Sequence, residues 1–192
     1  TSTKSEIEQL NKKVSHLQDI SLVKECSNGI FETLFAENNE NPCKKGLVKI
    51  TGNSNNNDEQ ELLPNLIDSK WNGDYWASKD VENSYVKIDF KEFLVKINKY
   101  RIRVGRTNGT SFFKSWVLKG VKVDNSEVVL DEVNNSCEIT QNHPEIIRLV
   151  QNQPFIRSIQ ITMKGESSED DYYMLMRNIE IFGYIKYSQV AV

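Results

Sequence analysis

The chain has 192 residues and a formal net charge of −3, with 38% hydrophobic and 27% charged residues. This length suits one domain plus an appendage and allows a real core. The acidic balance argues against a general nucleic-acid binder, which normally carries a basic surplus. No apolar run approaches the roughly 18 residues expected of a membrane-spanning helix. Because the chain begins at Thr1 rather than Met, we expect it to be a fragment or a processed product.

Residues 1–22 are predicted to form an amphipathic helix, which we interpret as the end of a coiled coil. Ile7, Leu10, Val14 and Leu17 follow the 3, 4, 3 spacing of coiled-coil core positions. Only about two heptads are present, whereas sustained coiled coils show ~3–4. Two interpretations stay open: the tail of an oligomerising stalk, which we favour, and a helix that lies on the following domain.

Residues 23–192 are predicted to form one β domain. After a short helix or turn at 29–36 and a loop at 38–45, alternating apolar and polar runs recur along the chain, separated by polar turns such as 53–58. The alternating runs are 46–51, 84–90, 95–104, 115–120, 128–130, 155–161 and 175–183. Short runs of period two without a long helical pattern between them predict an antiparallel β-sandwich.

Several of these runs resemble strands of the discoidin-like domain, also called the coagulation factor five/eight type C domain. Ser115-Trp116-Val117-Leu118-Lys119-Gly120 resembles its "S-W-x-L-x-G" strand, and Ile179-Glu180-Ile181-Phe182-Gly183 resembles its closing "I-E-F-F-G" strand. Further matches in the right order are 46–51, Tyr85–Phe90 and Phe155–Arg157. The resemblance implies an all-β, galactose-binding-like jelly roll that serves as a recognition module. The opening segments are similar to intracellular versions attached to BTB-containing proteins.

No catalytic constellation is visible in the sequence. The two histidines, His16 and His143, have no evident serine or cysteine partner, and no phosphate-binding or dinucleotide-binding glycine motif occurs. We therefore expect a protein that is not an enzyme.

The resemblance implies a structural calcium ion at one place in the chain. Asp68 and Glu180 stand at positions similar to those of calcium-binding relatives, and Asp74 offers a third oxygen. Lys70 lies in the same loop and would neutralise such carboxylates. We favour a salt-bridged or hydrogen-bonded acidic pair over a metal site, and no other cofactor is expected.

Ligand binding in jelly-roll modules usually falls to loops at one rim of the sandwich. The first rim loop is predicted at 70–80, the second at 103–114 and the third at 165–173. Aromatic rings stack on sugar or apolar surfaces, and Arg, Asn and Asp side chains give directional hydrogen bonds. The candidate ligand-binding residues are Trp71, Tyr75, Arg106, Asn108, Phe112, Asp171 and Tyr172. Trp116, inside a strand, is expected in the core.

The three cysteines, Cys26, Cys43 and Cys137, are odd in number and show no metal-binding spacing. The closing strand contains no cysteine that would tie the two ends of the domain together. We therefore expect reduced thiols and a cytoplasmic location.

The sequence supports two kinds of recognition. The leading hypothesis is a module that binds a protein partner through the rim loops and that self-associates through the N-terminal helix. The alternative is a carbohydrate-binding module that uses the same loops. Membrane binding ranks third, because the acidic residues of the third rim loop oppose anionic lipid. No nucleic-acid partner is expected.

Overall fold

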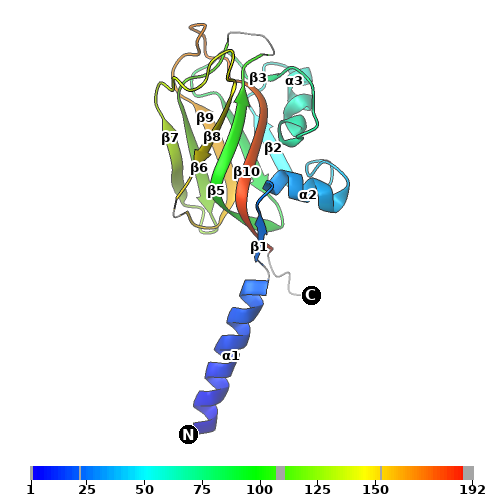
Figure 1. Cartoon of the computed structure of the whole chain (residues 1–192), viewed down its shortest axis with the longest axis vertical. Coiled ribbons are helices and arrows are strands. Elements are labelled where there is room, and N and C mark those ends of the chain that lie inside the picture. Colours follow the sequence, from blue (N-terminus) through cyan, green and yellow to red (C-terminus); the bar gives the residue numbers. More distant parts are fainter. Residues whose placement is uncertain (1, 22, 107–110, 152, 188–192) are drawn as a thin grey trace.

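The computed structural model describes residues 2–21, 23–106, 111–151 and 153–187 (Figure 1). A single helix precedes a β-sandwich that carries further short helices on one side. The helices are α1 (Ser2–Ser21), α2 (Ile30–Asn38), α3 (Asn57–Leu62) and the 3-10 helix η1 (Leu63–Ile67). The strands are β1 (Val23–Cys26), β2 (Val48–Gly52), β3 (Trp76–Ala77), β4 (Tyr85–Phe90), β5 (Phe93–Val104), β6 (Trp116–Lys122), β7 (Glu127–Val133), β8 (Glu145–Leu149), β9 (Ile156–Met163) and β10 (Leu175–Tyr187).

The strands form two antiparallel layers, which confirms the predicted β-sandwich. One layer runs β1–β10–β5–β8, with β3 paired to the start of β10. The other runs β2–β4–β9–β6–β7. The long strand β5 links the two layers through one pair, Val95 with Ile156 of β9.

The core lies between the two layers and follows the predicted alternation. Strand β4 buries every second side chain, and Trp76 and Trp116 are fully buried. A buried indole N–H needs an acceptor, and Nε1 of Trp116 donates to the hydroxyl of Tyr100 over 2.8 Å. That hydroxyl donates in turn to Asp131, whose carboxylate also pairs with Arg148. The expectation that Trp116 belongs to the core is confirmed.

Helix α1 projects away from the sandwich, at the end where β1 meets the close of β10 (Figure 1). Its apolar side chains Ile7, Leu10 and Val14 are 59%, 65% and 46% exposed. The helix therefore does not lie on the domain, and of the two sequence interpretations the stalk is the one that fits this arrangement. Coiled-coil association itself stays a prediction.

Two local predictions were incomplete. Residues 23–26 were not predicted as a strand, yet β1 pairs with the closing strand, with Val23 opposite Lys186 and Cys26 opposite Gly183. The first and last strands of the sandwich thus lie side by side. The stretch predicted as a turn at 53–58 runs into helix α3, because the side chain of Asn56 accepts a hydrogen bond from the backbone N–H of Glu59 and caps the helix. Within the described residues, no helix combines the length and apolar character needed to span a bilayer.

Candidate binding site

The three rim loops meet at one end of the sandwich, as the sequence predicts. The guanidinium of Arg106 in the second rim loop lies over the ring of Tyr75 in the first, 5.3 Å from its centroid. The backbone N–H of Phe112 donates to the hydroxyl of Ser168 in the third rim loop over 3.0 Å. The second loop therefore contacts both of the others.

The third rim loop is also tied to the first. The backbone N–H of Tyr172 donates to the carboxylate of Asp80 over 2.8 Å. The carboxylate of Asp171 accepts hydrogen bonds from the hydroxyl of Ser167 and from the backbone N–H of Tyr173. Asp171 thus stabilises its own loop through one carboxylate oxygen, Oδ1.

The predicted ligand-binding residues differ in their accessibility. Arg106 is exposed, whereas Trp71, Tyr75 and Phe112 are half-buried, and Trp71 and Phe112 pack against the core. Asn108 lies outside the described residues. The loops converge, but among the predicted residues only Trp71 lines the cavity that the structure forms beside them.

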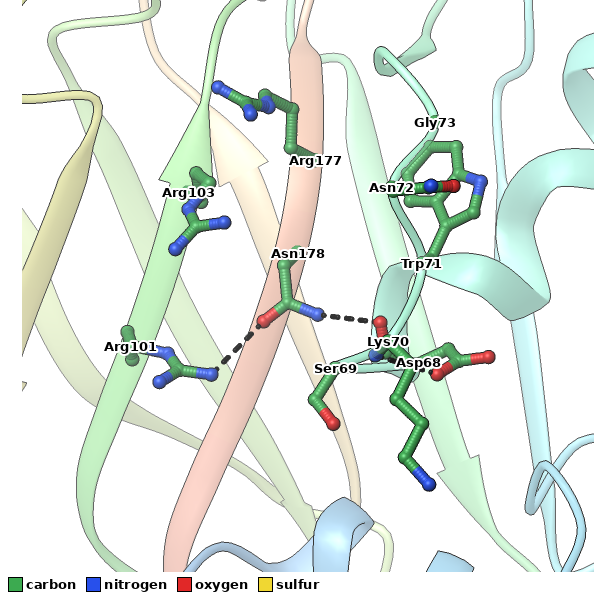
Figure 2. Close-up of a pocket in the computed structure, with 10 residues that line it drawn as sticks. All are labelled: Asp68, Ser69, Lys70, Trp71, Asn72, Gly73, Arg101, Arg103, Arg177 and Asn178. Carbon is green, nitrogen blue, oxygen red and sulfur yellow. Dashed lines mark hydrogen bonds between the residues drawn. The ribbon is translucent and has the colours of Figure 1, made fainter.

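This cavity has a volume of about 530 Å³ and opens between the outer faces of β5 and β10 and the segment that follows η1 (Figure 2). Its size falls in the range of ordinary small-ligand sites. Strand side chains form one wall and the first rim loop forms the other. The lining residues are Asp68, Ser69, Lys70, Trp71, Asn72, Gly73, Arg101, Arg103, Arg177 and Asn178.

The strand wall is built by two features of the sheet. Arg101 and Arg103 are two residues apart on β5, and successive side chains of a strand alternate between faces, so both point to the same side. On β10 the pairing with β5 shifts between Met176 and Asn178, which places Arg177 at a β-bulge. A bulge re-aims a side chain, and here both Arg177 and Asn178 line the cavity.

Asn178 fastens the two walls together. Its amide N–H groups donate to the backbone carbonyls of Leu66 and Asp68, over 3.0 and 3.4 Å, and so hold the segment after η1 against the strand. Its amide oxygen accepts from the guanidinium of Arg101 over 3.4 Å (Figure 2). One side chain therefore positions both the loop and an arginine.

The indole of Trp71 is held in a confined position within the loop wall. A Cβ atom added at Gly73 would lie 2.3 Å from the indole atoms Nε1 and Cε2, closer than any real contact. Position 73 therefore requires glycine for the indole to occupy this place. An aromatic residue and hydrogen-bonding groups thus line the same cavity, a combination that suits a sugar ring.

Sequence reasoning missed Arg101, Arg103, Arg177 and Asn178. The Arg-x-Arg spacing at 101 and 103 is the one signal that the sequence contains, because it puts two cations on one face of a predicted strand.

Glu180, a predicted metal ligand, has a different role. Its side chain is only 3% exposed, and it accepts hydrogen bonds from the backbone N–H groups of Phe31, Glu32 and Ile181 over 2.9, 3.1 and 3.0 Å. Two of these groups belong to the first turn of α2, whose N-cap residue Gly29 provides no side chain. Burial raises the pKa of this carboxyl to about 7, although the three N–H groups favour the ionised form.

The three carboxylates proposed for calcium are not brought together. Asp68 accepts a hydrogen bond from the backbone N–H of Lys70, within its own loop. In the parts of the chain that the structure describes, no three acidic, histidine or cysteine side chains gather in a metal-binding arrangement. The structure therefore does not assemble Asp68, Asp74 and Glu180 into one site, because Glu180 turns inward and caps α2.

The cysteines are unpaired and differ in exposure. Cys26 is buried, Cys43 is half-buried and Cys137 is exposed. Burial raises the pKa of the Cys26 thiol, and that of Cys43 to about 11. His143 lies exposed in a turn, where it pairs with Thr140 through the backbone.

No family model and no curated protein matches this sequence. Its fold nevertheless resembles solved carbohydrate-binding modules. The family 32 module of NanJ from Clostridium perfringens, in complex with galactose, superposes with a TM-score of 0.57 at 14% identity, over 73% of this chain and 95% of that module. The family 32 module of AlyQ, in complex with 4,5-unsaturated mannuronic acid, gives 0.52 at 16% identity, over 70% and 93%. Chitosan-binding module 1 from a chitosanase/glucanase of Paenibacillus sp. IK-5 gives 0.55 at 7% identity, over 71% and 96%. At these identities the likeness establishes a galactose-binding-like β-sandwich.

Proposed function

We propose that this chain is a non-catalytic carbohydrate-recognition module whose site is the cavity beside Trp71. The observation that carries the proposal is the position of the Trp71 indole, held against Gly73 at the wall of a cavity whose opposite wall bears arginine and asparagine side chains. Sugars present apolar C–H faces and hydroxyl groups together, and this pairing of an aromatic face with hydrogen-bond donors is complementary to both.

The structural neighbours support a glycan over a protein partner. Solved modules of this fold occur in complex with galactose and with 4,5-unsaturated mannuronic acid, and a third is a chitosan-binding module. The leading sequence hypothesis, a protein partner at the rim, has no comparable support, so the alternative becomes the preferred function. The rim pair of Tyr75 and Arg106 lies only a few residues along the chain from Gly73 and Arg103, and we assign it to the edge of the same site.

A glycan array followed by titration calorimetry tests this function. The full chain should bind a defined set of glycans, and Trp71→Ala should weaken that binding by at least about tenfold, since aromatic anchors carry much of a recognition energy. Tyr184→Ala is the matched control, because Tyr184 is a half-buried aromatic residue of β10 in the part that pairs with β1, away from the cavity. An array without any bound glycan, or equal losses in the two variants, would contradict the proposal.

A second proposal concerns helix α1, which we assign to self-association with a second copy of the chain. Its motivation is the exposed stripe of Ile7, Leu10 and Val14, at coiled-coil spacing on a helix that projects from the domain. Two heptads bury little apolar surface, so the association should be weak. Sedimentation should show a dimer at high micromolar concentration that Leu10→Lys removes, whereas a monomer throughout would refute this assignment.

A further inference from the structure

We propose that the cavity selects glycans that carry an anionic group, a carboxylate or a sulfate, and that Arg101, Arg103 and Arg177 bind this group. The inference rests on the proposed carbohydrate function and narrows it to a class of ligand. It arises from the positive charge of the cavity wall and from the small number of anionic partners that the guanidinium groups of this wall have within the protein.

The cavity is locally cationic on a chain whose net charge is −3. Four cationic side chains line it, against the single carboxylate of Asp68. One of the four, Lys70, directs its ammonium to the ring of Phe35, 4.7 Å from the centroid, and therefore away from the cavity. The positive charge that faces a ligand thus comes from the three arginines of the strand wall.

These arginines have few anionic partners within the protein. The guanidinium of Arg103 pairs with the carboxylate of Glu145 over 2.8 Å. Nε of Arg101 lies 3.9 Å from the same carboxylate and, among the described residues, finds no hydrogen-bond acceptor although it is buried. Within that same described part of the chain, no ion pair or hydrogen bond engages the side chain of Arg177. Among the described residues, one carboxylate therefore pairs with two of the three guanidinium groups, and the third, that of Arg177, has no such partner.

A buried donor without an acceptor costs free energy, and a ligand oxygen beside it would remove that cost. A guanidinium presents its donors in a planar fork that matches carboxylate and sulfate oxygens, and such charge-assisted hydrogen bonds are about twice as strong as neutral ones. Arg101 is 29% exposed at its side chain, so water screens the interaction only in part. A neutral sugar hydroxyl would use these donors less well than an oxyanion does.

Calorimetry with four related glycans tests the inference on the full chain. The probes are a neutral galactan oligosaccharide, an oligogalacturonate of equal length, its methyl ester and a sulfated galactan oligosaccharide. At least one acidic probe should bind about tenfold or more tightly than the neutral probe, and the methyl ester should lose the advantage of the galacturonate. The preference should also weaken as salt is raised. The two acidic arms show whether the bound group is a carboxylate or a sulfate.

Two variants locate the effect. Arg177→Gln should remove most of the preference for the acidic probe, measured as the ratio of the acidic-probe affinity to the neutral-probe affinity of the same variant. Arg157→Gln is the matched control, with the same loss of charge at an exposed residue of β9 in the other layer, and it should preserve the preference. Circular dichroism and thermal unfolding confirm that both variants fold.

The outcomes separate this inference from the function on which it rests. Trp71-dependent binding of neutral and acidic probes with equal affinity would overturn the anionic preference and leave the carbohydrate function standing. An equal loss of preference in Arg157→Gln would overturn the assignment to this cavity. Failure of all four probes together with an empty glycan array would refute the carbohydrate function itself.

Discussion

The buried carboxyl group of Glu180 should make the stability of the folded chain decrease as the pH rises from about 4.5 to 7. Burial raises the pKa of this group from its ordinary value of 4.5 to about 7 in the folded chain. Between these two values the folded chain holds a proton that the unfolded chain has released. Folding is therefore coupled to proton uptake, and each rise in pH within this window favours the unfolded state.

The size of the effect follows from the width of the window. Each pH unit in which one proton is bound only by the folded state changes the free energy of unfolding by about 1.4 kcal/mol. Over the interval from 4.5 to about 7 the contribution of Glu180 amounts to about 3 kcal/mol. It is fully present below pH 4.5 and is lost above pH 7, where both states are ionised. Solvent screening is small, since the side chain is only 3% exposed.

Urea unfolding of the natural chain and of Glu180→Gln at several pH values measures this contribution. Glutamine has the size of glutamate and does not ionise, so the difference between the two proteins isolates Glu180 from all other titrating groups. The variant should be less stable at low pH, because its amide turns a donor towards backbone N–H groups that need an acceptor. Its deficit should shrink by about 3 kcal/mol between pH 4.5 and 7.

A deficit that stays constant over this range would refute the raised pKa. A deficit that grows with pH would show the opposite, a carboxylate whose pKa the three N–H groups and the helix terminus hold below its ordinary value.

Three further predictions concern the site and the thiols. Gly73→Ala should displace the Trp71 indole, seen as a shift in tryptophan fluorescence and a loss of glycan binding like that of Trp71→Ala; an unchanged spectrum would contradict the confined position. Arg106→Ala should cost about 1 kcal/mol or more in glycan binding and barely change stability, since the exposed guanidinium lies over the ring of Tyr75. Calorimetry measures the binding and urea unfolding measures the stability. An unchanged affinity would exclude Arg106 from the site. In unreduced protein a thiol reagent should modify Cys137 first and the two less exposed thiols only on unfolding. Fewer than three modified thiols in the unfolded chain would reveal a disulfide and oppose the cytoplasmic location expected from the sequence.

The sequence predicts the sandwich well because each strand carries its own signal. Alternation in Tyr85–Phe90 translates directly into alternate burial in β4, and the apolar run around Trp116 lies in the core. The helix at the N-terminus is equally local, since its stripe is visible in the spacing of Ile7, Leu10 and Val14. Features of this kind depend on neighbours in the sequence, and a pattern therefore reveals them.

The cavity and the role of Glu180 depend on contacts between distant segments. Arg101 and Arg103 read as solvated charges on the outer face of a strand, until the segment after η1 is known to cross beside them. The bulge that aims Arg177 arises from a shift in pairing and leaves no mark in the sequence. Glu180 caps a helix that begins 150 positions earlier in the chain, at Ile30. Long-range geometry of this kind decides which charged side chains form a site.

The pairing of β1 with β10 also sets the distance between helix α1 and the cavity. Strand β10 has 13 residues and is therefore about 40 Å long at the usual rise per residue. Its first residues pair with β3 beside the rim, whereas its last residues pair with β1, which follows α1. The cavity is lined by residues near the start of β10, so an assembly held by α1 would carry its cavities at a distance from the helices. A polymer with repeated sugars would meet several weak sites at once, and each bound site would raise the effective concentration of the next. Modest affinity at one cavity would then suffice for lasting attachment to a repetitive surface and leave single sugars free to exchange.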